Sequence, residues 1–158
     1  MAYKDLRSPP PSSDAVKSSM KGNKGKDTRP EILLRSALHR SGKRYRTHYK
    51  KVPGSPDLAF VSKKLAIFVD GCFWHGCPSC LRLPSSNREY WEEKILRNAR
   101  RDKRVSRSLR GLGWKVCRIR ECRLKKKPQV QIRRIRRMLE IPEMSEQLSS
   151  TSNNFAVG

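Results

Sequence analysis

A cysteine-rich run over residues 68–80 holds the densest set of side chains that could do chemistry in this chain. It reads Phe-Val-Asp-Gly-Cys-Phe-Trp-His-Gly-Cys-Pro-Ser-Cys. Its three cysteines have the spacing C-x4-C-x2-C and are Cys72, Cys77 and Cys80. Four thiolates close a structural zinc site, so these residues predict tetrahedral Zn²⁺, with Cys117 or Cys122 available downstream as the fourth ligand. The alternative is a set of buried free thiols, which is common for one cysteine but awkward for three in so polar a segment.

Two carboxylates, Asp57 and Asp70, are expected near each other. Asp57 begins one expected strand directly after Pro56, and Asp70 follows the next strand. Carboxylates at adjacent strand ends bind Mg²⁺, which prefers hard oxygen ligands and can hold a water molecule and a scissile phosphate together. By itself, a Pro-Asp pair carries little information.

Three residues within the cysteine run have more than one interpretation. A metal-held loop leaves little room to bury both Phe73 and Trp74, and an exposed aromatic pair on a basic protein can wedge between bases. Core packing is the other interpretation, and spacing alone slightly favours it. His75 could be a metal ligand, a general base or neither.

The elements expected before the long helix are short. One helix begins with Thr28 as N-cap and Glu31 at the capping-box position, and it ends at Gly42. Its expected buried stripe consists of Leu33, Leu34, Ala37 and Leu38. Strands are predicted over residues 45–52, 58–61, 65–69 and 114–120, and a basic amphipathic helix over residues 129–139.

The longest helical signal covers residues 86–111. Its core-facing stripe steps alternately by four and three residues through Trp91, Ile95, Asn98, Asp102, Val105, Leu109 and Leu112. A buried aspartate is costly unless it meets a cation or hydrogen-bond donors, so Asp102 should have a specific partner or belong to a site. Basic residues occupy the other faces and could follow a phosphate backbone. They are Arg97, Arg100, Arg101, Lys103, Arg104, Arg107 and Arg110.

Composition limits the class of protein. The 158 residues suit one domain, and the formal net charge of +23 favours a polyanionic partner, nucleic acid above all. A solvated basic surface or a ribosomal-type protein would have a similar composition. We expect a flexible basic arm over residues 1–27, a folded domain over residues 28–140 and a disordered tail over residues 141–158. Since no apolar run suggests a membrane span or a signal peptide, an intracellular protein without membrane contacts is expected.

Several short blocks of the sequence follow one another in the order in which one protein family carries them. They are Asp27-Thr28-Arg29-Pro30-Glu31, the Pro-Gly-Ser-Pro-Asp run ending at Asp57, the run from Phe68 to Pro78, Tyr90-Trp91 through Lys94-Ile95, Asn98, Arg101-Asp102, and Gly113-Trp114 with Glu121-Cys122. In these blocks the chain resembles the very-short-patch-repair (Vsr) mismatch endonucleases over roughly residues 20–124. The central block is highly specific, unlike any one of its residues.

The resemblance implies an α/β, restriction-endonuclease-like fold with a mixed central sheet flanked by helices and a structural zinc site. It implies Mg²⁺-dependent hydrolysis of one strand of duplex DNA on the 5′ side of the thymine in a thymine–guanine mismatch, leaving a nick for repair synthesis. A monomeric enzyme of the bacterial cytoplasm is expected, with DNA and downstream mismatch-repair proteins as its partners.

The resemblance also assigns roles to individual residues. It makes Asp57 the principal Mg²⁺ ligand, with the carbonyl of Val69 as a second. His75 becomes the general base, Glu31 orients water at the metal, and Asp102 supports the histidine region. Phe73 and Trp74 correspond to an aromatic wedge, and Met20 to an apolar residue of the arm that enters the DNA from the other groove. Cys122 is preferred over Cys117 as the fourth zinc ligand because the Glu-Cys pair matches the family.

The chain departs from the best-known family pattern at three places. Asp70 stands where a histidine is usual, so Asp70 is expected either to bind metal directly or to position water. Cys77 and Cys80 stand where some members carry histidines. Arg120 replaces a usual tryptophan.

Two other functions fit the same residues. One is a homing or restriction-type nuclease without mismatch preference, and the other is a catalytically dead, zinc-stabilised DNA-binding module. The joint presence of Asp57, His75, Glu31 and Asp102 argues against the dead module, because a protein that only binds DNA has no need of that combination.

Overall fold

A four-stranded mixed sheet forms the centre of the molecule. The computed structural model describes residues 27–140, so the arm with Met20 and the tail over residues 141–158 lie outside the described residues. The strands follow chain order across the sheet: β1 (Arg46–Thr47), β2 (Leu58–Phe60), β3 (Leu65–Asp70) and β4 (Lys115–Arg120). β1, β2 and β3 pair antiparallel, whereas β3 and β4 pair parallel. The expected α/β class with a mixed sheet is therefore confirmed.

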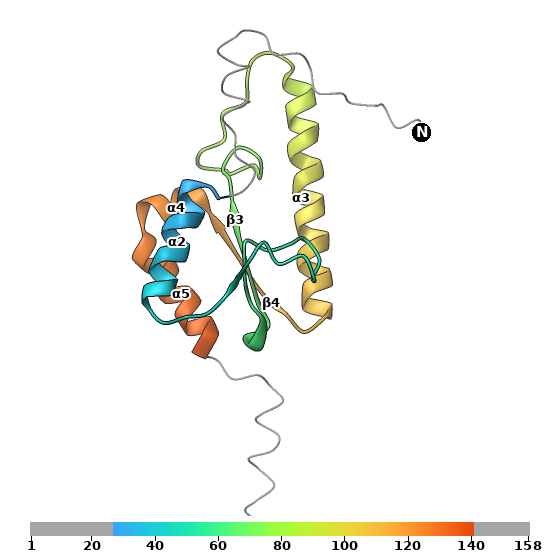
Figure 1. Cartoon of the computed structure of the whole chain (residues 1–158). Coiled ribbons are helices and arrows are strands. Elements are labelled where there is room, and N and C mark those ends of the chain that lie inside the picture. Colours follow the sequence, from blue (N-terminus) through green and yellow to red (C-terminus); the bar gives the residue numbers. More distant parts are fainter. Residues whose placement is uncertain (1–26, 141–158) are drawn as a thin grey trace, which may run out of the picture.

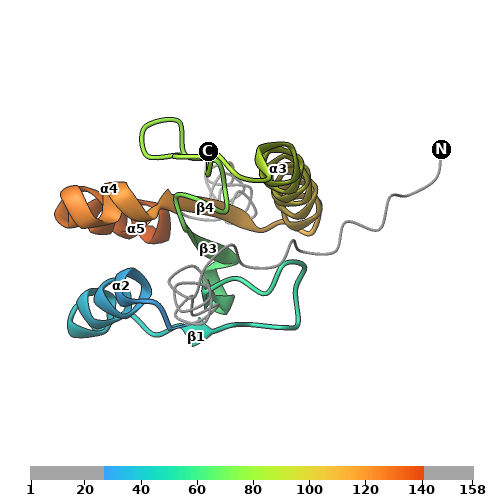
Figure 2. The same cartoon turned by 90° about the horizontal axis from the view of Figure 1, so that it is seen from above.

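Helices cover both faces of this sheet (Figures 1 and 2). One face carries α3 (Arg88–Gly111), and the other carries α2 (Arg29–Arg40), α4 (Glu121–Lys126) and α5 (Pro128–Glu140). Alternate side chains of β3 point to opposite faces of the sheet, so this strand contributes to the hydrophobic core on each side. Leu65 and Ile67 pack with residues of α2 and α5, whereas Ala66 and Phe68 pack on the α3 side with Leu109. A strand covered on both faces has to be apolar throughout, as β3 is until it ends at Asp70.

The first predicted strand is much shorter than expected. Only β1 remains of residues 45–52, because His48 adopts a left-handed conformation with φ of 44° and turns the chain. β2 ends at Phe60 and continues into a short 3-10 helix over Val61–Lys63. The helix α4 was not predicted, since its six residues are too few to show a periodic pattern.

Two leucines assigned to buried stripes are exposed. Leu34 and Leu38 of α2 are fully buried, but Leu33 is 45% exposed because it lies about 100° around the helix from Leu34. Leu112 follows the last turn of α3 and is 56% exposed, so the stripe of that helix ends at Leu109.

Two glycines allow loops to lie directly against α3. Gly54 has φ of 78°, and a β-carbon there would come within 2.3 Å of Val105. Gly76 has φ of 58°, and its β-carbon would come within 2.8 Å of Ile95. Any larger residue would clash at both places and would also be strained at these angles. The loop before β2 and the cysteine loop are thereby held beside α3.

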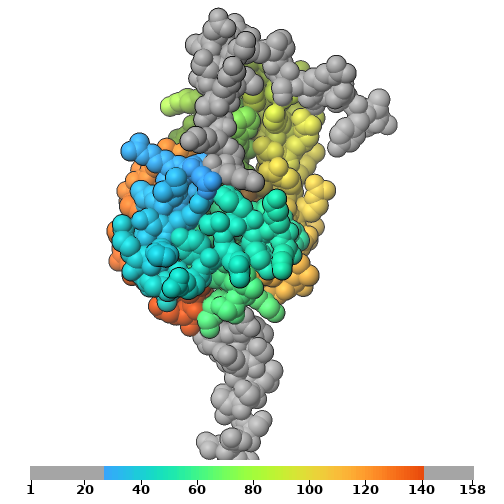
Figure 3. Space-filling model, viewed as in Figure 1, coloured from blue at the N-terminus to red at the C-terminus, as the bar shows by residue number. Residues whose placement is uncertain are grey.

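The helices between residues 27 and 140 include none that is both long enough and apolar enough to span a membrane. In the space-filling view, α2 and the segment leading from it to β2 form one face, and part of α3 is visible beside them (Figure 3).

Candidate active site

A cleft of about 790 Å³ opens at the carboxyl end of β3, between α2 and α3. Its lining includes every side chain predicted to be catalytic: Glu31, Asp57, Asp70, His75 and Asp102. Val69 and Trp74 line it as well. The fold thus brings residues of α2, of two loops, of β3 and of α3 into one concave site, the arrangement that enzymes use most often.

Asp57 lies at the entry to β2, where one donor among residues 27–140, the backbone N–H of Val69, holds its carboxylate. The N–H of Val69 donates to Oδ2 of Asp57 across 2.7 Å, and Nδ1 of His48 lies 4.0 Å from Oδ1. Burial, together with the negative charges of Glu31 and Asp70, raises the pKa of Asp57 to about 6, although the hydrogen bond from Val69 acts to lower it. A buried carboxylate with this pKa favours a cation.

Glu31 is buried, and its carboxylate accepts three hydrogen bonds. Oε1 accepts from the hydroxyl of Thr28 (2.7 Å), and Oε2 accepts from Nη2 of Arg35 (2.9 Å) and from the backbone N–H of Asp27 (3.1 Å). The predicted capping box is therefore wrong in detail, because the hydroxyl of Thr28 bonds the carboxylate and caps no backbone N–H of α2. Thr28 is nevertheless the N-cap, and Gly42 follows the helix end with a positive φ, as expected.

His75 and Asp102 form a close pair. Nδ1 of His75 lies 2.5 Å from Oδ2 of Asp102. A carboxylate oxygen accepts this hydrogen bond, so Nδ1 is the donor, and in the neutral ring the lone pair is at Nε2. The prediction that Asp102 has a specific partner is confirmed, and this arrangement suits a histidine that accepts a proton at Nε2.

Asp70 is bound at both carboxylate oxygens by one guanidinium. Arg118 of β4 donates from Nε to Oδ2 (2.9 Å) and from Nη2 to Oδ1 (2.6 Å), and Nη2 also lies 3.0 Å from Oδ1 of Asp102. This bidentate ion pair gives Asp70 a cationic partner within the protein. It does not favour the expectation that Asp70 binds a metal directly.

Sequence reasoning missed three residues of this site: Arg35, His48 and Arg118. Arg35 lies 2.6 Å from Asp27 and 2.9 Å from Glu31, and Nε2 of His48 lies 3.3 Å from Asp27. The i,i+4 spacing of Glu31 and Arg35 on a helix was a signal that could have found the first contact. No local signal pointed to His48 or Arg118, whose acidic partners are remote in the sequence.

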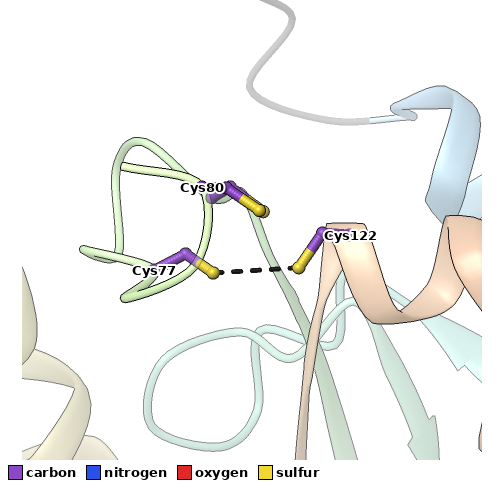
Figure 4. Close-up of side chains that lie close together, drawn as sticks. Cys77, Cys80 and Cys122 are labelled. Atoms are coloured by element: carbon purple, nitrogen blue, oxygen red, sulfur yellow. Dashed lines mark hydrogen bonds between the residues drawn. The ribbon is translucent and has the colours of Figure 1, made fainter. Parts of the chain in front are cut away.

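Four thiols gather beside the cleft, at one end of the sheet. They belong to Cys72, Cys77, Cys80 and Cys122, and their sulfur atoms lie within 4.8 Å of one another. Figure 4 shows Cys77 and Cys80 on the loop facing Cys122 at the start of α4, with 3.7 Å between the sulfurs of Cys77 and Cys122. Cys117 is fully buried in the core instead.

The thiol cluster fits zinc by chemistry and spacing. Sulfurs placed tetrahedrally about 2.3 Å from zinc lie roughly 3.8 Å apart, close to the separation of Cys77 and Cys122. Burial opposes ionisation of Cys77, but hydrogen bonds from the backbone at Ser79 and from the neighbouring thiols outweigh it and lower its pKa to about 7. Burial raises the pKa of the Cys72 thiol instead, and hydrogen bonding with Cys122 raises that of Cys80. The neighbouring thiols thus stabilise one thiolate among them, and the fit to zinc rests on the type and spacing of the four ligands.

Phe73 and Trp74 belong to an aromatic cluster with Trp91 and Tyr90 of α3. Phe73 lies 5.1 Å from Trp74 and 5.3 Å from Trp91, centroid to centroid and edge to face. Nζ of Lys94 lies 5.8 Å from the rings of Trp74 and Trp91. Phe73 and Trp74 are half-buried and belong to neither core cluster. Trp91, expected only as part of the stripe of α3, contributes to this surface.

Comparison with known proteins identifies relatives. The family model described as DNA mismatch endonuclease Vsr matches residues 12–82. The type II nicking enzyme V.NaeI of Lentzea aerocolonigenes is 42% identical over 70% of this chain and 70% of its own length. V.XorIIP of Xanthomonas oryzae pv. oryzae, also a type II nicking enzyme, is 45% identical over 64% of this chain and 75% of its own. The DNA mismatch endonuclease Vsr of Escherichia coli is 38% identical over 63% of this chain and 65% of its own.

Proposed function

The chain belongs to the Vsr family of DNA mismatch endonucleases, and from this premise we propose that it nicks one strand of duplex DNA on the 5′ side of the thymine in a thymine–guanine mismatch. The reaction is hydrolysis of a phosphodiester bond with Mg²⁺ as cofactor. The mixed sheet with helices on both faces is consistent with the restriction-endonuclease-like fold that the family implies.

The observation that carries this proposal is the contrast between Asp57 and the other acidic residues of the cleft. Glu31 is paired with Arg35, and Asp70 and Asp102 share Arg118. Asp57 has no arginine or lysine partner among residues 27–140. It is therefore the carboxylate that a divalent cation would neutralise.

The residues of the cleft divide the work of hydrolysis. Nε2 of His75 takes the proton of the attacking water, while Asp102 holds the ring by Nδ1 and stabilises the imidazolium that results. A phosphorus–oxygen bond forms to the water oxygen, and the bond to the leaving strand breaks. Solvent protonates the leaving oxygen. Glu31, which is buried and accepts three hydrogen bonds from Asp27, Thr28 and Arg35, would orient water near Asp57.

The carboxylate of Asp57 and the carbonyl of Val69 would hold Mg²⁺. When bound, the ion supplies Lewis-acid stabilisation of the charge that develops on the phosphate. The four clustered cysteines would hold Zn²⁺ in a structural role, fixing the loop that carries Phe73, Trp74 and His75.

The aromatic cluster supports recognition of a mismatch. Trp74 and Lys94 line the cleft, and the rings of Phe73 and Trp91 pack against Trp74, so apolar surface and a positive charge lie together there. A thymine–guanine wobble pair displaces both bases, so the adjacent step should be easier to open than a step between matched pairs. Insertion of a ring there would place the neighbouring phosphate near the cleft.

A nicking enzyme without mismatch preference is the competing function. The names of V.NaeI and V.XorIIP specify nicking only. Strand-resolved cleavage of otherwise identical matched and mismatched duplexes, with Mg²⁺ or EDTA, separates the two. Equal cleavage of both duplexes would reject the mismatch preference, and no cleavage of either would reject the nuclease. A library randomised around one thymine–guanine mismatch then defines the flanking bases.

A further inference from the structure

We propose that Arg118 is a positioning residue for His75, acting through Asp102 and Asp70. This inference rests on the proposed function, because it takes His75 as the base. Its starting point is the register of the sheet, in which Arg118 of β4 pairs with Phe68 of β3. The guanidinium carbon lies 4.6 Å from the centroid of the Phe68 ring, so the charged group is supported from one side by an aromatic face.

One guanidinium connects two structural elements. Nε and Nη2 take both oxygens of Asp70, at the end of β3, and Nη2 also reaches Asp102, on α3. The planar fork of arginine matches a carboxylate at two points, which determines the orientation of the acid as well as its distance. Arg118 is only 22% exposed, so solvent screens these interactions weakly.

Each carboxylate oxygen of Asp102 therefore contacts a different partner, Arg118 or His75. Oδ1 faces Arg118 at 3.0 Å, and Oδ2 faces Nδ1 of His75 at 2.5 Å. Rotating the carboxylate would disturb both the hydrogen bond with His75 and the ion pair with Arg118. Arg118 consequently fixes the oxygen on which the histidine ring is aligned.

Arg118 also removes a competitor for the histidine. Oδ1 of Asp70 lies 3.7 Å from Nδ1 of His75, close enough to attract it. Because Arg118 occupies both oxygens of Asp70, Asp102 is the carboxylate that accepts from His75. Without the guanidinium, two neighbouring carboxylates would repel each other and compete for one ring N–H.

The neighbouring arginine supports the same loop. Arg120, two residues further along β4, donates to the carbonyl of His75. Side chains two apart in a strand share a face, so both arginines approach the histidine from the α3 side of the sheet. Arg120 restrains the backbone of His75, whereas Arg118 restrains the partner of its ring.

The test compares the full-length protein with Arg118→Met, Asp70→Asn and their double variant, and adds two further single variants as references. Arg118→Met should lower the single-turnover cleavage rate by about 100-fold, near the lower end of what a general base contributes, with DNA affinity changed by only a few-fold. Adding Asp70→Asn should recover at least about 10-fold of that loss, because it removes the competing carboxylate. Arg118→Lys should lie between, since it keeps the charge without the fork. Arg133→Met, an exposed arginine on α5, controls for loss of positive charge.

A proton NMR spectrum of the metal-loaded protein without DNA gives a second readout. The Nδ1 proton of His75 should resonate far downfield in the wild type, be absent in His75→Gln and move upfield in Arg118→Met or, if that variant folds poorly, in Arg118→Lys. An unchanged resonance, or a double variant as slow as the product of the single losses, would overturn the positioning role. Full cleavage by His75→Gln would instead reject the proposed function, so the two failures are distinguishable.

Discussion

The backbone N–H of Val69 donates a hydrogen bond to Oδ2 of Asp57 across 2.7 Å and ties the entry of β2 to the end of β3. The two residues proposed to hold Mg²⁺ are thus linked within the folded protein itself. A ligand oriented before the cation arrives needs little rearrangement to bind it, which is the general requirement for a precise site.

Asp57→Asn should abolish cleavage, with a loss of about 1,000-fold or more in single-turnover rate, while mismatch binding stays within a few-fold. The amide keeps an oxygen that can accept from Val69 but loses the charge that attracts the metal. Glu140→Gln at the exposed end of α5 is the matched control for loss of one negative charge. Retained Mg²⁺-dependent nicking by purified Asp57→Asn would remove Asp57 from the mechanism.

The same variant should change how stability depends on pH. Because the pKa of Asp57 rises from 3.8 to about 6 on folding, the native state binds more protons than the unfolded state between these values. The free energy of unfolding of the wild type, measured without Mg²⁺, should therefore fall as pH rises from about 4 to about 6, relative to Asp57→Asn. At pH 8 the variant should be more stable by an amount on the order of 2 kcal/mol, and Mg²⁺ should stabilise only the wild type. Parallel pH profiles for the two proteins, measured by urea unfolding, would contradict this.

The elements that sequence could predict are those with a long or unbroken pattern. β3 is an uninterrupted apolar run, and α3 repeats its stripe from Ile95 to Leu109, so both were found nearly in full. The length of the first strand was overestimated, because no feature of this polar segment indicates the left-handed turn at His48. The exposure of Leu33 shows that a leucine beside the stripe is easily mistaken for one within it.

In the candidate site, too, residues within a recognisable sequence pattern could be predicted and those outside one could not. The acidic residues and the histidine could be named because their motif is contiguous or matches a family. Arg118, which pairs with Asp70 and Asp102, could not be predicted, since it meets Asp70 from 48 positions away. Ion pairs between remote segments depend on strand register, which no local spacing encodes.

The cysteine cluster should hold one zinc ion per chain. Replacing Cys72, Cys77, Cys80 or Cys122 by serine should cause loss of the metal and lower the melting temperature, because the remaining three thiolates no longer complete the zinc site that stabilises the fold. Cys117→Ala, in the core, should keep its zinc and show only the cost of a small cavity, about 1 kcal/mol. Metal analysis and thermal unfolding test this, and a zinc-free native protein with full activity would exclude the site.

DNA affinity should fall steeply with salt, and the exposed face of α3 should account for part of the slope. Each neutralised phosphate contributes a log–log slope of about −0.9, so replacing Arg104 and Arg107 by glutamine should flatten the salt dependence by roughly one unit for each phosphate that is no longer neutralised. Both residues are exposed. Arg133→Gln on α5 is the control for charge away from the cleft. Equal slopes for all variants would mean that α3 does not follow the DNA backbone.

Phe73 and Trp74 provide the sharpest test, because an enzyme that finds one wrong pair among many right ones must detect more than charge. The two rings are half-buried against Trp91 and lie outside both core clusters. Replacing both by alanine should therefore weaken binding to mismatched DNA by about 1–3 kcal/mol for each ring that no longer stacks on a base, with little change in salt-sensitive binding to matched DNA.

The competing role in stability predicts a different pair of results for the same double variant. If the rings served mainly as core, their loss would cost roughly 3–5 kcal/mol of stability and weaken both DNAs equally. Phe60→Ala, deep in the core at 4% exposure, shows what such a loss looks like in the melting temperature. We expect the double variant to melt well above Phe60→Ala and to lose most of its preference for the mismatch. A collapsed melting temperature with an unchanged ratio of mismatched to matched affinity would reject the wedge, because discrimination would then come from elsewhere in the cleft.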